Sequence, residues 1–185
     1  MKTLLFIYLR GGKLRLIKKM THKDIKKIEG KIFRRRASRG IIVQDSKILL
    51  LYTERYNDYS FPGGGVDEGE DLITGLKREL IEEVGAQNIQ VLSEFGYIDE
   101  YRPHYKAPYD FMHMLSYFYV CQIDAELQPA KLEEHEIANG MSPVWMDIDE
   151  AIKHNKRVMA KKEATMGMSI ERETLALELV AKELV

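Results

Sequence analysis

The chain has 185 residues, of which 45% are hydrophobic and 31% are charged, and its formal net charge at pH 7 is −1. This length and composition predict one well-cored domain with extensions and exclude wholesale disorder. The longest apolar runs are far shorter than the roughly 20 residues of a membrane-spanning helix, so we expect no membrane partner.

Cysteine usage indicates the compartment. The single cysteine, Cys121, cannot form an intrachain disulfide, which fits a reducing environment. The early apolar stretch Leu4–Leu9 is too short for the core of a secretion signal. We therefore expect a cytoplasmic protein, with Cys121 as a buried residue of the alternating segment Leu115–Ile123 and without a chemical role.

Charge is distributed unevenly along the chain. Half of the 28 Lys and Arg residues lie before residue 40, where the acidic residues are Asp24 and Glu29. Such a segment either holds phosphate-rich partners or nucleic acid, or is a solvated segment that balances an acidic body. We favour the second interpretation, because the segment lacks the interleaved aromatics expected of a nucleic-acid-binding surface. Residues 1–35 are thus expected to form a basic N-terminal extension, and residues 36–185 the folded domain with its C-terminal helix.

The first clear pattern predicts a buried hairpin followed by a shaped loop. Ile41–Val43 and Lys47–Tyr52 are apolar runs on either side of an Asp45-Ser46 turn. The loop Phe61–Gly65 contains one proline and three glycines, which break regular structure and permit tight backbone turns.

The next pattern predicts a helix of about 14 residues. Leu72, Leu76 and Leu80 recur every four residues and form one apolar face, and Gly85 is the expected C-terminal cap. The last helix should pack its apolar side on the body or on a partner. The further predicted elements are strands at Ile89–Tyr97, Met112–Ile123 and Pro143–Met146, a helix beginning near Asp147, and a helix over Ser169–Val185.

Three glutamates on the first predicted helix carry the strongest chemical signal. Glu79, Glu82 and Glu83 are spaced by three and four residues, so they project from one face, opposite the leucines. Their mutual repulsion costs stability, which a bound cation would offset. Hard oxygen ligands of this kind suit Mg²⁺, with Mn²⁺ as the alternative ion.

The flanking residues complete a pattern suited to metal-assisted phosphoryl chemistry. Glu70 lies at the helix entrance, and Arg78 precedes Glu82 by four residues, where it can pair with a carboxylate and fix its orientation. In the preceding loop, Gly64 allows close approach of the backbone and offers its carbonyl.

The segment from Gly64 to Ala86 resembles the Nudix box. The matched positions, all at the family's spacing, are Gly64, Glu70, Arg78, Glu79, Leu80, Glu82, Glu83 and Gly85. Ala86 departs from the family, which usually has a larger aliphatic residue there. The alternative, an amphipathic surface helix with a solvated acidic face, explains neither the glycine loop nor Glu70.

The resemblance, expected to cover residues 36–160, implies an α/β/α sandwich with a mixed sheet and a loop-helix-loop metal site. It implies Glu79, Glu82 and Glu83 as metal ligands, with Gly64 joining through its carbonyl. The general base is then Glu79 or a residue of a later loop, for which Glu136 in the segment Leu132–Glu136 is the candidate. Glu136 is alternatively an additional ligand or an exposed loop charge.

The implied activity is metal-dependent hydrolysis of the pyrophosphate bond of a nucleoside diphosphate linked to another moiety. ADP-ribose, sugar nucleotides, dinucleoside polyphosphates and nucleoside triphosphates all remain open. Two rivals are an RNA 5′-end pyrophosphohydrolase, with the basic residues 10–39 holding the strand, and a non-catalytic Nudix-fold ligand sensor. Degraded glutamates would mark the sensor, and none is degraded.

Substrate-binding candidates lie on either side of the box. Arg55, Tyr56 and Tyr59 precede the glycine loop and Arg102 lies downstream, where they either stack on a base and pair with phosphate or pack at strand edges. Tyr101–Tyr105 contains a proline, which in the family points to ADP-ribose, and tyrosines, which point to dinucleoside polyphosphates. The segment therefore does not distinguish between these two substrates. Many relatives are homodimers, and the last helix is a candidate contact.

Overall fold

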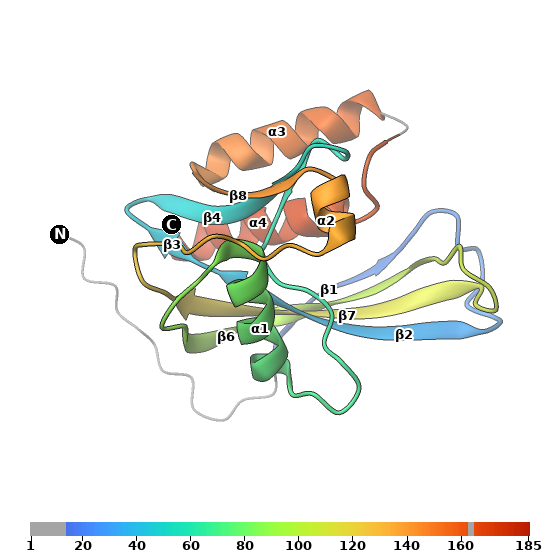
Figure 1. The fold of residues 1–185 in the computed structure, drawn as a ribbon. Helices are drawn as coiled ribbons and strands as arrows, with labels where there is room; N and C mark the ends of the chain where they lie inside the picture. Colours follow the sequence, from blue (N-terminus) through green and yellow to red (C-terminus); the bar gives the residue numbers. More distant parts are fainter. Residues whose placement is uncertain (1–13, 163–164) are drawn as a thin grey trace.

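The computed structural model describes residues 14–162 and 165–185, whose strands form two sheets with helices packed around them (Figure 1). Parallel and antiparallel pairs occur in the same sheet, so the expected α/β fold with a mixed sheet and flanking helices is confirmed. No helix in these two ranges is long and apolar enough to cross a membrane.

The first sheet has the strand order β1-β6-β7-β2. Its two central strands, β6 and β7, are antiparallel, and each edge strand runs parallel to its neighbour. The strands are β1 (Leu16–Thr21), β2 (Ile32–Ile41), β6 (Gln90–Pro103) and β7 (Phe111–Gln122).

The second sheet is built around β4, which pairs antiparallel with its three partners. The predicted hairpin is present as β3 and β4, whose turn residues Asp45 and Ser46 have positive φ angles. The strands are β3 (Val43–Gln44), β4 (Lys47–Thr53), β5 (Asp58–Ser60) and β8 (Met141–Met146).

The helix α1 follows the local signals of its sequence. Its N-cap Asp71 accepts hydrogen bonds from the backbone N–H groups of Ile73 and Thr74 at 3.0 and 3.1 Å. Gly85 ends it in the left-handed region with φ 66°, where an added Cβ would collide with the carbonyl oxygen of Gln128. The helices are α1 (Leu72–Val84), α2 (Glu134–Ala138), α3 (Ile148–Lys161) and α4 (Ile170–Leu184).

Two apolar clusters hold these layers together. One joins the leucine face of α1 to β4 and to the end of β7, where Tyr119 and Cys121 are buried as expected for Cys121. The other packs α3 and α4 against β4, β6 and β7 around Phe61 and Phe118. Each fully buried large apolar side chain contributes about 1.5–3 kcal/mol, so helices and sheets are fixed relative to one another.

The helix α4 packs its apolar side on the body of the domain, one of the two expected alternatives, and it also buries Arg172 and Glu173. The structure corrects the expectation for Glu136. Glu136 was placed in a loop, but it lies in the short helix α2, which a capping box at Glu133 initiates.

Three strands were not foreseen in full. β1 pairs with β6 although its own residues are poorly patterned, and β2 begins at Ile32, so the expected boundary at residues 35 and 36 falls inside this strand. β6 continues to Pro103 through Asp99 and Glu100, polar residues that suggest a strand end. Glu100 is nevertheless buried, because Arg172 of α4 pairs with it.

Candidate metal and phosphate site

The loop Phe61–Gly65 is held along the free edge of β2. The N–H groups of Ser38 and Gly40 donate to the carbonyls of Gly64 and Pro62 at 3.0 and 2.8 Å. At Gly63, whose φ is 124°, an added Cβ would collide with the carbonyl oxygen of Ser38. The glycines therefore let the loop lie directly against the strand, in one defined path.

Glu79 reaches this loop from α1. An added Cβ at Gly64 would collide with the Glu79 carboxylate, so the absence of a side chain at this position is what admits the carboxylate. Partial burial raises the pKa of Glu79, and the neighbouring Arg78 opposes that shift.

Glu83 lies deeper in the same site. It is 5% exposed, and its Oε2 accepts a hydrogen bond from the backbone N–H of Gly63 at 2.5 Å. Burial raises its pKa to about 8, although Arg39 and the Gly63 N–H favour the charged form.

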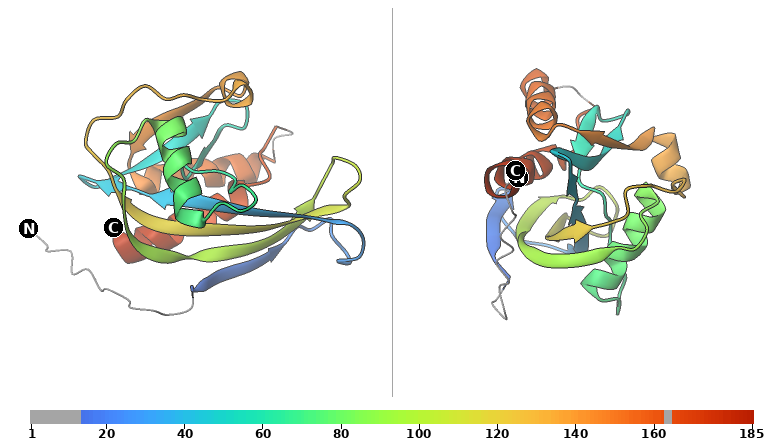
Figure 2. Two further views of the ribbon diagram at one scale, coloured as in Figure 1. Left: turned by 60° about the horizontal axis from the view of Figure 1, so that its bottom comes forward. Right: turned by 90° about the vertical axis from the view of Figure 1, so that its left-hand side faces the viewer.

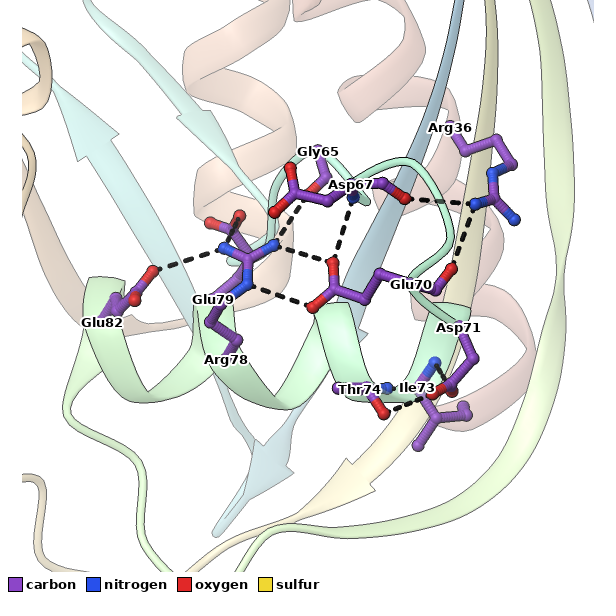
Figure 3. Close-up of polar contacts among 10 residues, drawn as sticks. All are labelled: Arg36, Gly65, Asp67, Glu70, Asp71, Ile73, Thr74, Arg78, Glu79 and Glu82. Carbon is purple, nitrogen blue, oxygen red and sulfur yellow. Dashed lines mark hydrogen bonds and ion pairs between the residues drawn. The ribbon is translucent and has the colours of Figure 1, made fainter.

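Arg78 connects the carboxylates on the helix (Figure 3). Its Nη1 contacts Glu79 at 2.7 Å and Glu82 at 3.5 Å, and its Nη2 contacts Glu70 at 3.1 Å and the carbonyl of Gly65 at 3.0 Å. Hydrogen bonds to Glu70 and Glu79 raise the pKa of Arg78. The guanidinium thus orients three glutamates and the loop at once.

The donor set suits a hard divalent cation. Three carboxylates lie on one helix face, beside a cradle at Gly64 that a Cβ would fill and a backbone carbonyl at the same residue. Within residues 14–162 and 165–185, no three Asp, Glu, His or Cys side chains converge on one point. Arg78 holds Glu79 and Glu82 instead, so a cation bound here would compete with its guanidinium for these two carboxylates.

Glu136 lies within electrostatic reach of the glutamates. Its charge contributes to the raised pKa of Glu83, so α2 brings it toward the helix α1. Its Oε2 accepts a hydrogen bond from the N–H of Glu133 at 2.8 Å as part of the capping box. One carboxylate oxygen of Glu136 therefore caps its own helix, and the other oxygen is not part of the capping box.

A cluster of arginines also lies beside the loop and within electrostatic reach of the glutamates. Arg39 donates through Nη1 to the carbonyls of Phe61, at 3.3 Å, and Gly63. Arg35 and Arg102 form no ion pair in the described parts of the chain, and the Nε atoms of Arg39 and Arg102 are buried without a hydrogen-bond partner. Burial and the neighbouring guanidinium groups lower the pKa values of Arg35 and Arg102. Unpaired cations of this kind fit an anionic group such as phosphate.

A cavity of about 530 Å³ opens beside Arg35 and Arg102. Much of its wall is aromatic, and the Phe33 ring lies 5.1 Å from His104 and 5.2 Å from Tyr109. The other lining residues are Pro103, Tyr105, Lys106, Ala107, Met112 and Met168.

Of the substrate-binding candidates, the structure brings only Arg102 to this cavity. Arg55 donates to the Oδ1 of Asn139 at 3.0 Å and lies over the ring of Tyr56. Tyr59 packs against Tyr52 and His154, with ring centroids 5.1 and 4.9 Å apart. These three side chains therefore line the turn between β4 and β5 and the neighbouring α3, outside the cavity.

Sequence reasoning missed a buried ion-pair network beneath the loop. Arg172 contacts Glu100 at 2.5 Å and Glu173 at 2.8 Å, and Glu173 also accepts a hydrogen bond from the N–H of Phe61 at 3.1 Å. Adjacent charges in a C-terminal helix ordinarily face solvent, so nothing in the sequence distinguishes these residues. They tie α4 to the start of the glycine loop.

Comparison with known proteins identifies a family. The model of the NUDIX domain matches residues 34–166, well over half of the chain. Over 43 residues the chain is 49% identical to an RNA pyrophosphohydrolase of Sulfurovum sp. (strain NBC37-1), and over 73 residues it is 36% identical to one of Pasteurella multocida (strain Pm70). These matches cover 23% and 37% of this chain and 27% and 35% of the relatives' own lengths, so the chain matches about a third or less of each.

A solved structure has the same fold. A NUDIX hydrolase from Nitrosomonas europaea superimposes with a TM-score of 0.50 at 18% identity, covering 81% of this chain and 91% of that one. At this identity the likeness concerns the fold alone.

Proposed function

The chain belongs to the NUDIX domain family, and from this premise we propose that it hydrolyses the pyrophosphate bond of a nucleoside diphosphate linked to another moiety. One observation carries the proposal. Glutamates of α1 and arginines of β2 both approach one glycine loop, next to a cavity with aromatic walls. Acidic ligands for a cation and basic partners for phosphate are the two halves of a pyrophosphate site.

Nudix hydrolases generally use divalent metal ions, and we assign Mg²⁺ to this chain, with Mn²⁺ as the substitute. Glu79, Glu82, Glu83 and the carbonyl of Gly64 would hold it. When bound, such an ion polarises a phosphoryl oxygen and lowers the pKa of a bound water. Arg78 orients these carboxylates through its contacts with Glu79 and Glu82, and a bound ion would share the two carboxylates with it.

The arginines and the cavity bind the substrate in this proposal. Arg35 and Arg102 line the cavity and pair with the phosphates, since neither guanidinium forms an ion pair with a carboxylate within residues 14–162 and 165–185. The cavity has the size of a small-molecule site, and rings such as Phe33 and Tyr109 offer flat apolar surfaces to a nucleobase.

Glu79 and Glu136 are the two candidates for the general base. Glu79 lies against Gly64 at the centre of the site, whereas Glu136 approaches from α2. Replacing the base by glutamine removes the proton acceptor and should lower kcat by roughly 10²- to 10⁴-fold. We expect Glu79→Gln to have this effect and Glu136→Gln to have a much smaller one, measured as initial rates under saturating substrate.

The activity is tested by a release assay on the purified protein with Mg²⁺, Mn²⁺ or EDTA. The substrates are ADP-ribose, nucleotide sugars, dinucleoside polyphosphates, nucleoside triphosphates and 5′-triphosphorylated RNA, and the products measured are AMP, pyrophosphate and phosphate. We expect metal-dependent turnover that Glu82→Gln abolishes and that the same change at the exposed Glu126 leaves intact. Silence across this panel, with metal binding retained, would indicate a ligand sensor and overturn the proposal.

A second candidate is removal of phosphates from the 5′ end of RNA. It is favoured by the curated relatives, which are RNA pyrophosphohydrolases, although they match this chain over short segments. Preference for 5′-triphosphorylated RNA over free nucleotides in the same assay would select this candidate.

A further inference from the structure

Part of one face of the first sheet extends beyond the helix α1 that covers the rest of it. The helix α1 packs over the end of β7 at Tyr119 and Cys121. Figures 1 and 2 show β2, β6 and β7 continuing past α1. Along this stretch Tyr97, Tyr101 and Tyr117 are partly exposed, while the residues that alternate with them, such as Ile98 and Phe118, are buried.

The two central strands supply stacked rings to this face. Tyr101 stacks on His113 with a centroid distance of 4.3 Å and an interplanar angle of 9°, and Tyr97 stacks on Tyr117 at 5.7 Å and 30°. Both are directly paired residues of β6 and β7. The two pairs are four residues apart along each strand, roughly 13 Å at the usual strand rise.

The two edge strands supply cations to the same face. Arg34 and Arg36 of β2 are in register with His113 and Leu115, and Lys19 of β1 is in register with Asp99. All three cations are exposed, and none forms an ion pair with a carboxylate in the part of the chain that the structure describes. The Asp99 carboxylate is instead 2.8 Å from the Nε2 of His113.

This face adjoins the segment that leads from the glycine loop into α1. Arg36 donates from its Nη2 to the carbonyl of Glu70 at 3.1 Å, directly before α1 (Figure 3). Burial raises the pKa of Tyr117, and the charge of Arg36 opposes that rise, so the two side chains are neighbours. An extended polymer bound on the rings can therefore pass beside Arg36 toward the carboxylates of α1.

We propose that this open sheet face, comprising Lys19, Arg34, Arg36, Tyr97, Tyr101, His113 and Tyr117, binds single-stranded RNA. This inference rests on the proposed function, and it makes the 5′ end of RNA the substrate class of the proposed hydrolysis. Exposed rings on central strands accept unpaired bases, and cations along both edges accept the phosphates between them. Base-paired RNA hides its base faces, and a protein partner would require a more apolar patch than one edged by exposed cations.

The open sheet face also supplies the aromatic side chains that the basic N-terminal segment lacks in the sequence. Its aromatic side chains come from β6 and β7, which parallel pairing places beside the basic strands β1 and β2. Cations on the two edge strands therefore flank the rings on the two central strands, although cations and rings are far apart along the chain.

The test is direct binding of a labelled 5′-hydroxyl single-stranded RNA to the full chain in EDTA, measured by fluorescence anisotropy. No reaction is possible with this probe, so binding is read independently of catalysis. We expect Tyr101→Leu to weaken binding roughly 5- to 100-fold, the usual effect of losing one stacked base. Arg34→Gln should weaken it and lower the slope of log K against log salt concentration by about 0.7. Arg157→Gln, an exposed arginine of α3, is the matched control and should change neither quantity.

Several results would overturn the proposal. These are absence of RNA binding by the wild-type chain, equal binding by Tyr101→Leu, and equal affinity for duplex RNA. A dimer that dissociates on Tyr101→Leu in light scattering would assign the face to a second copy of the chain. RNA binding that depends on Tyr101 and Arg34 without hydrolysis of any substrate would leave this inference standing and refute the proposed activity.

Discussion

Removing Arg172 tests whether the buried ion pairs beneath the glycine loop hold the domain together. Arg172 is 1% exposed and contacts Glu100 and Glu173, which are 5% and 1% exposed. Arg172→Met keeps a long apolar side chain but leaves two buried carboxylates without their cation. Breaking such a pair costs about 3–5 kcal/mol, a large part of the 5–15 kcal/mol by which a domain is typically stable.

The loss should depend on pH. Burial alone would raise the pKa of Glu173, yet Arg172 and Arg39 hold it below its ordinary value. In the wild type this carboxyl therefore stabilises the fold above its unfolded pKa of about 4.3 and loses that contribution as the pH falls. Without Arg172, burial dominates and the pKa rises, so the variant is least stable at high pH and recovers as the carboxyl is protonated. The difference in the free energy of unfolding between the wild type and Arg172→Met should therefore become smaller as the pH falls from about 8 to about 5.

Urea denaturation at both pH values measures the effect, with Arg15→Met as the control. Arg15 contacts Glu183 at 3.1 Å on the surface, with side-chain exposures of 48% and 35%, and its loss should cost less than about 1 kcal/mol. If Arg172→Met does not fold, Glu173→Gln keeps an acceptor for the Phe61 N–H and provides a milder test. Equal losses in the buried and surface variants, or a loss that does not change with pH, would refute the reasoning.

Three further outcomes are expected. Gly64→Ala should lower turnover on the order of 10²-fold with little change in thermal stability, because its Cβ displaces the Glu79 carboxylate; normal turnover would refute this role for the glycine. Burial, and to a smaller extent Glu173, raises the pKa of Asp58 to about 6. Protonated Asp58 therefore favours folding at low pH, and this contribution to stability is lost as the pH rises through about 6. Asp58→Asn should therefore stabilise the protein on the order of 2–3 kcal/mol at about pH 8 and not at about pH 4 in urea denaturation, and an equal effect at both would contradict the assignment. Arg102→Met should raise KM roughly 10- to 100-fold with a smaller change in kcat, and an unchanged KM would remove Arg102 from phosphate binding.

The carboxylate helix could be predicted because its signals are local. Leucines every four residues, glutamates three and four apart and a glycine cap express the geometry of a single helix, and α1 has these bounds to within a residue. The N-cap at Asp147 and the buried Cys121 are read from their neighbours in the same way. Such features depend on residues within one or two turns or along one strand.

Long-range pairing explains the elements that were missed or misplaced. β1 has no clear pattern of its own and exists through its pairing with β6, about 80 residues later. Bulges in β6 interrupt its alternation, and its buried Glu100 suggests solvent until Arg172 is seen beside it. The substrate candidates Arg55, Tyr56 and Tyr59 precede the glycine loop in sequence, but the turn after β4 carries them away from the cavity.

The sequence by itself determined the family, the carboxylate face of α1 and the glycine loop before it, because fixed spacing within about two dozen residues encodes them. Only the tertiary structure decided which charges meet. Arg35 of β2 and Arg102 of β6 line the cavity together, and Glu173 of α4, paired with Arg172, accepts a hydrogen bond from the loop. The reason is physical: an isolated charge in a sequence predicts a solvated side chain, and only packing shows which charges are buried, paired or left for a ligand.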